Sequence, residues 1–300
     1  MRSSAAGHLR AAGIVGTVHL PGRRTAIVFE DAKDRAILSK LFSSTWARPF
    51  LLILIVLVLW DLAILVFGIP QYLVPAPLAV AEQIWNEWPM LLGESLPTVY
   101  ATLGGFALSV VIGVPMAMMI AYSRLIESYL YPLLVFSQSI PKVAIAPLFV
   151  VWFGFGLLPK VIVAFLLGFF PIVVSTVMGF KSVEVDMVDL ARSMGSTRLN
   201  MFLKISLPHA LPSIFSSMKV SITLAVVGAV VGEFVGSNAG IGYVLQKANG
   251  NFDLPLMFAA LVFLSLIGVL LFLAIDAIER LAIPWHVSQR GTVHSTMRWR

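Results

Sequence analysis

Long apolar runs that are almost free of charge constrain the fold of this chain more than any other feature of its sequence. A bilayer core about 30 Å thick is crossed by roughly 20 residues of helix. Only 12% of the 300 residues are charged, about half the share of a soluble domain. The sequence therefore predicts an all-α membrane protein with six transmembrane helices, over residues 49–69, 99–122, 128–156, 161–180, 212–236 and 254–275.

The distribution of basic residues predicts the orientation. Of the 21 Lys and Arg residues, 17 fall on one side of the six predicted helices, eight of them in the N-terminal tail 1–48. Because cytoplasmic loops carry the excess of Lys and Arg, we expect this tail, the internal loop 181–211 and the C-terminal tail 286–300 to lie in the cytoplasm. Orientation also accounts for the net charge of +6, and no nucleic-acid partner is expected.

The segment 70–98 is expected on the opposite, external side. It contains no Lys or Arg, and it places Trp85 and Trp88 among glutamates. Since tryptophan favours the headgroup level of a bilayer, we expect an interfacial helix here that begins near Pro77. The third predicted span contains three prolines and the fourth contains Pro171. Missing backbone N–H groups should kink or interrupt both spans.

The loop 181–211 predicts two short amphipathic helices. Gly195 supplies the left-handed conformation that ends a helix, and Ser196 or Thr197 can cap the next one. Pro208 and Pro212 are expected to end the second helix. The first apolar stripe is Val185, Val188, Ala191 and Met194, and the second is Leu199, Phe202 and Leu203. Pattern alone equally allows a simple hairpin that rests on anionic lipid.

The spacing within this loop is more specific than its composition. Asp189 and Ala191, then Gly195, then Ile205-x-Leu207-Pro208 resembles the cytoplasmic loop signature of the permease subunits of bacterial ATP-binding-cassette (ABC) importers, with Asp-Leu-Ala where Glu-Ala-Ala is usual. The runs QSIPKVAIAPLFVVWFGFGLLPK from Gln138, FFPIVVSTV from Phe169 and EFVGSNAGIGYVL from Glu233 resemble the subfamily for nitrate, sulfonates and taurine. The resemblance covers about residues 91–285.

This resemblance implies a type I, MetI-like permease core in a bacterial inner membrane, and no cofactor. It implies as partners two copies of a cytosolic ABC ATPase, a second permease copy and an extracytoplasmic solute-binding protein, with a small anion as solute. The loop would then couple the spans to the ATPase, with Leu199, Phe202 and Leu203 as an apolar knob. The implied coupling residues are Asp189, Ala191, Arg192, Gly195, Arg198, Leu199, Phe202, Leu203, Ile205, Leu207 and Pro208.

Two charged residues within predicted spans are candidates for the translocation pathway. Lys142 could attract an anionic solute or extend to the headgroups, and Glu233 could line the cavity or lie at the membrane rim. Gly228, Gly232 and Gly236 have the small-xxx-small spacing of closely packed helices, either within the subunit or across a dimer.

An enzyme is not expected. The sequence contains no phosphate-binding loop, no cysteine and no ligand-like spacing among its five histidines, so ATP hydrolysis would belong to a partner chain. The alternative function is an ion-coupled secondary transporter or channel that works without an ATPase, with Asp61, Lys142 and Glu233 as its charged pathway.

Overall fold

The computed structural model describes residues 47–70 and 73–284, and every regular element in this part of the chain is helical. The predicted tails 1–48 and 286–300 lie outside the described residues, except for the last two of the first tail. Helix α2 (Ala47–Phe67) is a single apolar helix in which Asp61 is the only acid. The elements that follow are α3 (Pro77–Tyr122), α4 (Arg124–Gln138), α5 (Lys142–Phe153), α6 (Leu157–Lys181), α7 (Val185–Ser193), α8 (Arg198–Met201), the π-helix η1 (Phe202–Ser206), α9 (Leu207–Gly236), α10 (Ile241–Gly250) and α11 (Leu254–Ala282).

Four stretches of this structure are long and apolar enough to cross a membrane: α3, α6, the continuous run Arg198–Gly236, and α11. The pair α4 and α5 makes a fifth if it is taken as one bent span, and α2 contributes a shorter apolar helix. The all-α membrane fold is therefore confirmed, whereas six spans and the cytoplasmic position of both termini stay predictions.

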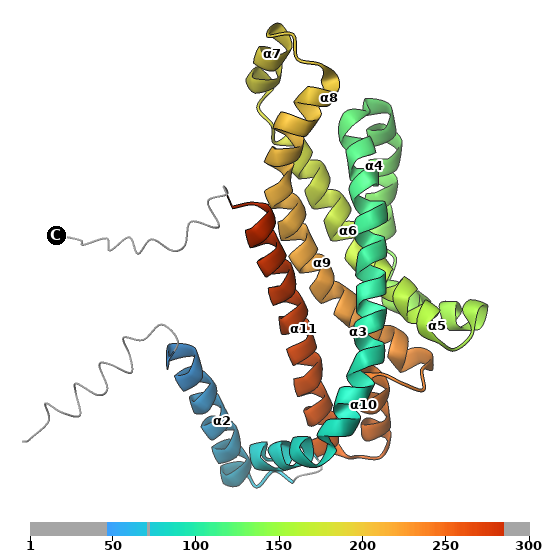
Figure 1. The fold of residues 1–300 in the computed structure, drawn as a ribbon. Helices are drawn as coiled ribbons and strands as arrows, with labels where there is room; N and C mark the ends of the chain where they lie inside the picture. Colours follow the sequence, from blue (N-terminus) through green and yellow to red (C-terminus); the bar gives the residue numbers. More distant parts are fainter. Residues whose placement is uncertain (1–46, 71–72, 285–300) are drawn as a thin grey trace, which may run out of the picture. The chain divides into compact units, whose positions relative to one another are not determined.

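Helix α3 includes both the expected interfacial helix and the expected second span. A helix does begin at Pro77, where a proline is well tolerated in the first turn. It then continues through Pro89 and Pro97 without a break to Tyr122, so the expected interfacial helix is the first part of a 46-residue helix. Figure 1 shows this first part turned steeply away from the rest of α3.

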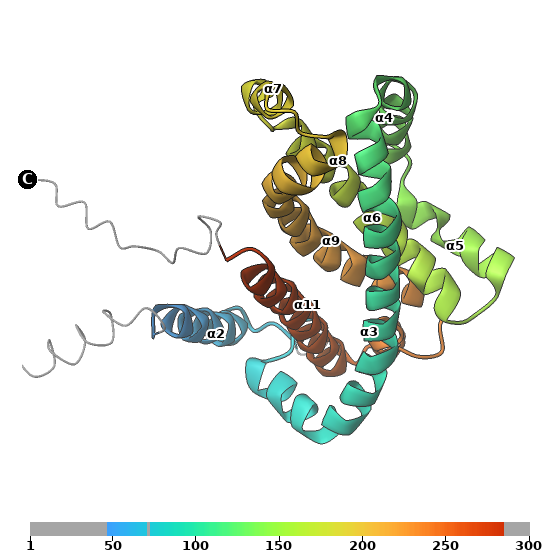
Figure 2. The ribbon, with the colours of Figure 1, turned by 45° about the horizontal axis from the view of Figure 1, so that its top comes forward.

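The predicted interruption of the third span is confirmed. Helices α4 and α5 meet at an angle of 93° across a break that ends at Pro141. Pro141 cannot donate a backbone N–H, and its ring disfavours helical geometry at Ile140. Pro171, by contrast, lies inside an unbroken α6. Figures 1 and 2 show α5 and α11 on opposite sides of α3.

Helix α6 is the centre of the bundle and packs against both α3 and α9. A Cβ on Gly228 of α9 would lie 2.6 Å from the Cα of Ala164, and one on Gly232 would lie 2.8 Å from the Cα of Lys160. Both contacts are with the backbone of α6. The small-xxx-small spacing therefore serves close packing within the subunit, which selects one of the two alternatives left open by the sequence.

Candidate functional site

The loop that joins α6 to α9 ends its first helix in the predicted way. Gly195 has a φ of +79°, its N–H donates to the carbonyl of Arg192, and the N–H of Ser196 donates to the carbonyl of Ala191. These two bonds form a Schellman motif, in which a glycine in the left-handed region satisfies the last carbonyls of a helix. The next helix, α8, is capped by Thr197, whose hydroxyl accepts from the N–H of Asn200 at 3.3 Å.

This turn predicts how substitutions of Gly195 behave. A side chain there would meet no atom within 4 Å, so its cost comes only from the positive φ. Gly195→Val is expected to lose at least about 1 kcal/mol of local stability, whereas Gly195→Asn, which tolerates this conformation, should lose less. Hydrogen exchange of residues 190–200 in the purified protein measures the difference. Equal protection in both variants would contradict the role of the turn.

The exposed apolar surface of α7 differs in part from the predicted stripe. Val188 and Ala191 are half-buried, but Met187, Leu190 and Met194 are exposed, with Leu190 at 62%. These three residues follow i, i+3, i+7 spacing and so lie on one face of the helix. We call this set the α7 apolar face.

Phe202 was expected in the apolar knob, and the structure places its side chain partly against the bundle. Its ring lies 5.7 Å from the ring of Tyr122 and 6.0 Å from the ring of Phe180, and the side chain is half-buried. Phe202 therefore anchors the loop to α3 and α6. Leu199 and Leu203 remain exposed, at 65% and 49%, and only these two of the predicted knob are accessible to a partner.

The prolines after α8 do not end the helix as expected. Pro208 cannot donate to the carbonyl of Lys204, four residues earlier. The chain instead widens into the π-helix η1, in which the N–H of Leu207 donates to the carbonyl of Phe202, and continues directly into α9. Helix η1 thereby joins the loop to α9 without a break in the helical backbone.

Of the remaining predicted coupling residues, some are exposed on the surface and others pack against the bundle. Asp189 and Arg192 form an exposed ion pair at 3.1 Å, and Arg198 begins α8 with an exposed side chain. Ile205, Leu207 and Pro208 are half-buried, and Leu207 packs against the apolar cluster around Phe180. The three polar residues are thus available to a partner, while the Ile-x-Leu-Pro end of the motif faces the bundle.

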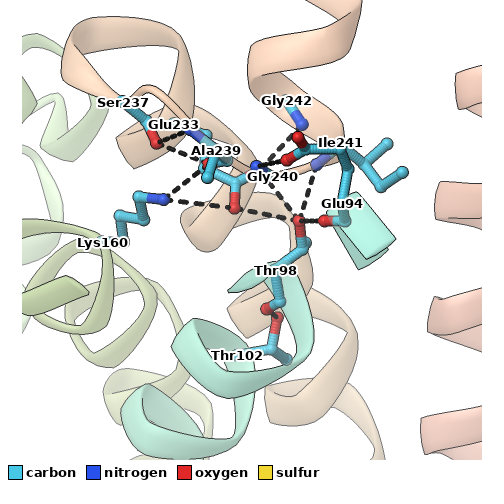
Figure 3. A network of polar contacts seen from close by, with 10 residues as sticks. All are labelled: Glu94, Thr98, Thr102, Lys160, Glu233, Ser237, Ala239, Gly240, Ile241 and Gly242. Atoms are coloured by element: carbon cyan, nitrogen blue, oxygen red, sulfur yellow. Dashed lines mark hydrogen bonds and ion pairs between the residues drawn. The ribbon is translucent and has the colours of Figure 1, made fainter. Parts of the chain in front are cut away.

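A buried polar network occupies the opposite end of α6 and α9 (Figure 3). Glu233 has no exposed surface. Its carboxylate accepts from the hydroxyl of Thr98 at 2.9 Å and from the N–H of Gly242 at 2.8 Å, and the ammonium of Lys160 lies 3.8 Å away. Four helices, α3, α6, α9 and α10, therefore meet at one carboxylate. Its ionic partner and hydrogen bonds offset the cost of burying the charge.

The same network holds the turn between α9 and α10. Lys160 donates to the carbonyl of Ala239 at 2.7 Å, and the carboxylate of Glu94 accepts from the N–H of Gly240 at 2.6 Å. Gly240 has a φ of +117°, and a Cβ there would overlap the carboxylate of Glu233. Only glycine lets the turn approach this closely.

The two candidate pathway residues are not brought together. Glu233 is engaged in the network and faces the protein interior in this conformation, whereas Lys142 lies 4.5 Å from the centre of the Phe170 ring on α6. Thr98, Glu94 and Lys160 were not among the predicted site residues. The sequence signal for the Lys160–Glu233 pair was weak: Lys160 directly precedes the predicted span 161–180, and Glu233 lies three residues before the end of the span 212–236.

Comparison with known proteins gives relatives that match nearly their whole length. A formylaminopyrimidine transport permease, ThiX, of Halalkalibacterium halodurans is 38% identical over 81% of this chain and 97% of the relative. A riboflavin transport system permease, RibX, of Chloroflexus aurantiacus is 37% identical over 79% and 89%. A putative aliphatic sulfonates transport permease, SsuC, of Bacillus subtilis is 27% identical over 82% and 90%.

The fold also matches a solved structure of the MetNI methionine ABC transporter in an inward-facing conformation. The match has a TM-score of 0.54 at 20% identity and covers 69% of this chain and 98% of the other, which supports the expected MetI-like fold. The family profile described as binding-protein-dependent transport system inner membrane component matches residues 109–284. This chain therefore belongs to that family and is a permease subunit of an ABC importer.

Proposed function

We propose that the 182–206 loop docks on a cytosolic ABC ATPase and couples ATP hydrolysis there to movement of the spans. The exposed α7 apolar face, flanked by Leu199 and Leu203, is the single observation that supports this most strongly. Exposed apolar residues with a polar rim, here Asp189, Arg192 and Arg198, are the usual composition of a protein interface. Phe202, η1 and the Schellman turn make the loop stiff enough to transmit force.

The complete transporter in this proposal contains two ATPase copies, a second copy of this permease and an extracytoplasmic solute-binding protein. The surface of α5 is evidence for a second copy, because the apolar side chains of Leu148, Val151 and Trp152 are exposed there. The buried Glu233 network would then hold the external end of each subunit. The complex lies in a bacterial inner membrane with the loop on the cytoplasmic side.

The orientation can be tested directly because the chain contains no cysteine. A single Ser193→Cys substitution places a thiol on the exposed surface of α7. A membrane-impermeant maleimide is expected to label it in inside-out vesicles and not in intact spheroplasts. A Gln246→Cys variant on the exposed side of α10 should give the reverse pattern, and labelling of Ser193→Cys in intact spheroplasts would overturn the orientation.

For the solute we propose a small organic compound with a nitrogen-containing aromatic ring. The relatives named for formylaminopyrimidine and riboflavin share more identity with this chain than the relative named for aliphatic sulfonates. The small anion expected from the sequence is the second candidate, supported by Lys142 at the break in the α4–α5 span. Binding of both solute classes to the solute-binding protein encoded beside this chain distinguishes them.

Leu190→Asp is expected to weaken the complex with the ATPase by at least tenfold in affinity. The substitution puts a charge at the centre of the α7 apolar face, where a docked partner would have to remove water from it. Val185→Asp is the matched control, because it adds the same charge to an exposed apolar position of the same helix, five residues earlier and therefore on a different face. Copurification of the ATPase with each variant, together with solute-stimulated ATP hydrolysis, measures the effect. Unchanged copurification with Leu190→Asp would refute the docking surface.

The ion-coupled carrier makes a different prediction. Proteoliposomes that contain this chain alone would take up solute along an ion gradient if it were a carrier. We expect no uptake without the ATPase and ATP. Gradient-driven uptake by the isolated chain would exclude the importer mechanism.

A further inference from the structure

A cavity of about 520 Å³ lies behind the α7 helix, where the loop joins the spans. Its polar lining consists of Lys204, His209 and the hydroxyls of Ser182 and Ser213, and its apolar lining includes Met187 and Ile205. Ser182 ends α6, Ser213 lies near the start of α9, and Met187 belongs to α7. Anything bound here would contact the loop and both spans together.

The lining has the chemistry of a phosphate-ester site. Lys204 and His209 both have exposed side chains, and within residues 47–70 and 73–284 neither has a hydrogen-bond or ion-pair partner. No carboxylate is among the lining residues. The hydroxyl of Ser182 already donates to the carbonyl of Gly179. An ammonium, an imidazole N–H and the hydroxyl of Ser213 are donors that suit an anion with several acceptor oxygens. Lys204 and Ile205 belong to the π-helix η1, a geometry that is frequent at functional sites.

We propose that this cavity binds the phosphate headgroup of an anionic phospholipid. A free phosphate ester offers the same oxygens, but the apolar side chains of Ile205, Pro208 and Pro212 in the lining suit an amphiphile better. The cavity also lies where α6 ends and α9 begins, and in this proposal that end of both helices is at the level of the headgroups. Basic pockets between helices on the cytoplasmic side of membrane proteins commonly bind such lipids. The cytoplasmic position rests on the proposed function, and a bound lipid would fix α7 relative to α6 and α9.

Native mass spectrometry of the complex, released from nanodiscs of phosphatidylcholine with and without phosphatidylglycerol, tests this site. The unmodified protein should retain phosphatidylglycerol, and Lys204→Gln should lower its affinity about fivefold. Arg124→Gln is the matched control, since it removes the same charge from an exposed position on the same predicted side, outside the cavity. Ser213→Ala, which keeps the charge and removes one lining hydroxyl, should weaken retention less than Lys204→Gln.

Three results would overturn the proposal. Equal retention by Lys204→Gln and the unmodified protein would show that the cavity does not select the headgroup. An equal loss in Arg124→Gln would assign the effect to general surface charge. Displacement of the lipid by soluble glycerophosphate or inorganic phosphate would make a free phosphate the ligand instead. Lipid retention is measured without ATP, so its failure is separate from failure of ATPase docking or of the maleimide orientation test.

Discussion

Replacing Gly228 with valine is expected to destabilise the permease more than any surface substitution. A Cβ at this position would lie 2.6 Å from the Cα and 2.9 Å from the backbone nitrogen of Ala164. Backbone atoms cannot change rotamer as a side chain can, so the whole of α9 must move away from α6. Overpacking of this kind costs about 1–3 kcal/mol or more.

Gly268 of α11 provides the control for this prediction. No atom lies within 4 Å of a Cβ built there, so Gly268→Val should change stability by less than about 0.5 kcal/mol. The apparent melting temperature of the two purified variants, with the amount of each in the membrane, measures the difference. Similar melting temperatures would show that α6 and α9 can separate without cost, contrary to the packing described above.

Removing one partner of the Lys160–Glu233 pair is the second large effect expected. Lys160→Met leaves the carboxylate of Glu233 fully buried without its ammonium and removes one of the two donors to the carbonyl of Ala239. Glu233→Met leaves the ammonium of Lys160 without this carboxylate, and removes the acceptor of Thr98 and Gly242. Breaking a buried pair in this way costs about 3–5 kcal/mol, and we expect a clear fall in melting temperature for each single variant.

The double variant Lys160→Met/Glu233→Met tests whether the stability lost in each single variant comes from the broken ion pair or from altered packing. Because both charges are then absent, its loss should be smaller than the sum of the two single losses. Asp189→Asn breaks the exposed pair with Arg192 and should change stability by no more than about 1 kcal/mol. Strict additivity of the two buried substitutions would exclude a direct interaction between the side chains.

Local chemistry allowed much of the fold to be predicted. Runs of apolar residues predicted α6, α9 and α11 because their length has to match the membrane. The three prolines of the third span predicted an interruption, which occurs at Pro141, while Pro132 and Pro147 lie inside α4 and α5. Gly195 predicted the turn after α7, because a glycine acts on its own backbone. The same local reasoning failed at Pro208, where a shift to π-helical bonding removed the need for the helix to end.

Contacts between distant segments could not be predicted in this way. The pattern of the loop showed that Leu199, Phe202 and Leu203 share a face, but not that Tyr122 and Phe180 cover one of them. The continuity of α3 was not predicted, because the glutamates and tryptophans of segment 70–98 and its lack of Lys and Arg indicated a segment outside the membrane. The partners of Glu94 and Thr98, Gly240 and Glu233, lie about 140 residues later in the sequence.

The position of the Lys160–Glu233 pair also has a consequence for biogenesis. Glu233 follows Lys160 by 73 residues, and at about 5–20 residues per second the ribosome completes α6 several seconds before α9. During that interval α6 holds an unpaired cation, but Lys160 is the fourth residue of the helix and its side chain can reach the headgroups. Burial of Lys160 and closure of the turn at Ala239 are therefore late steps of membrane insertion, which wait for the arrival of α9.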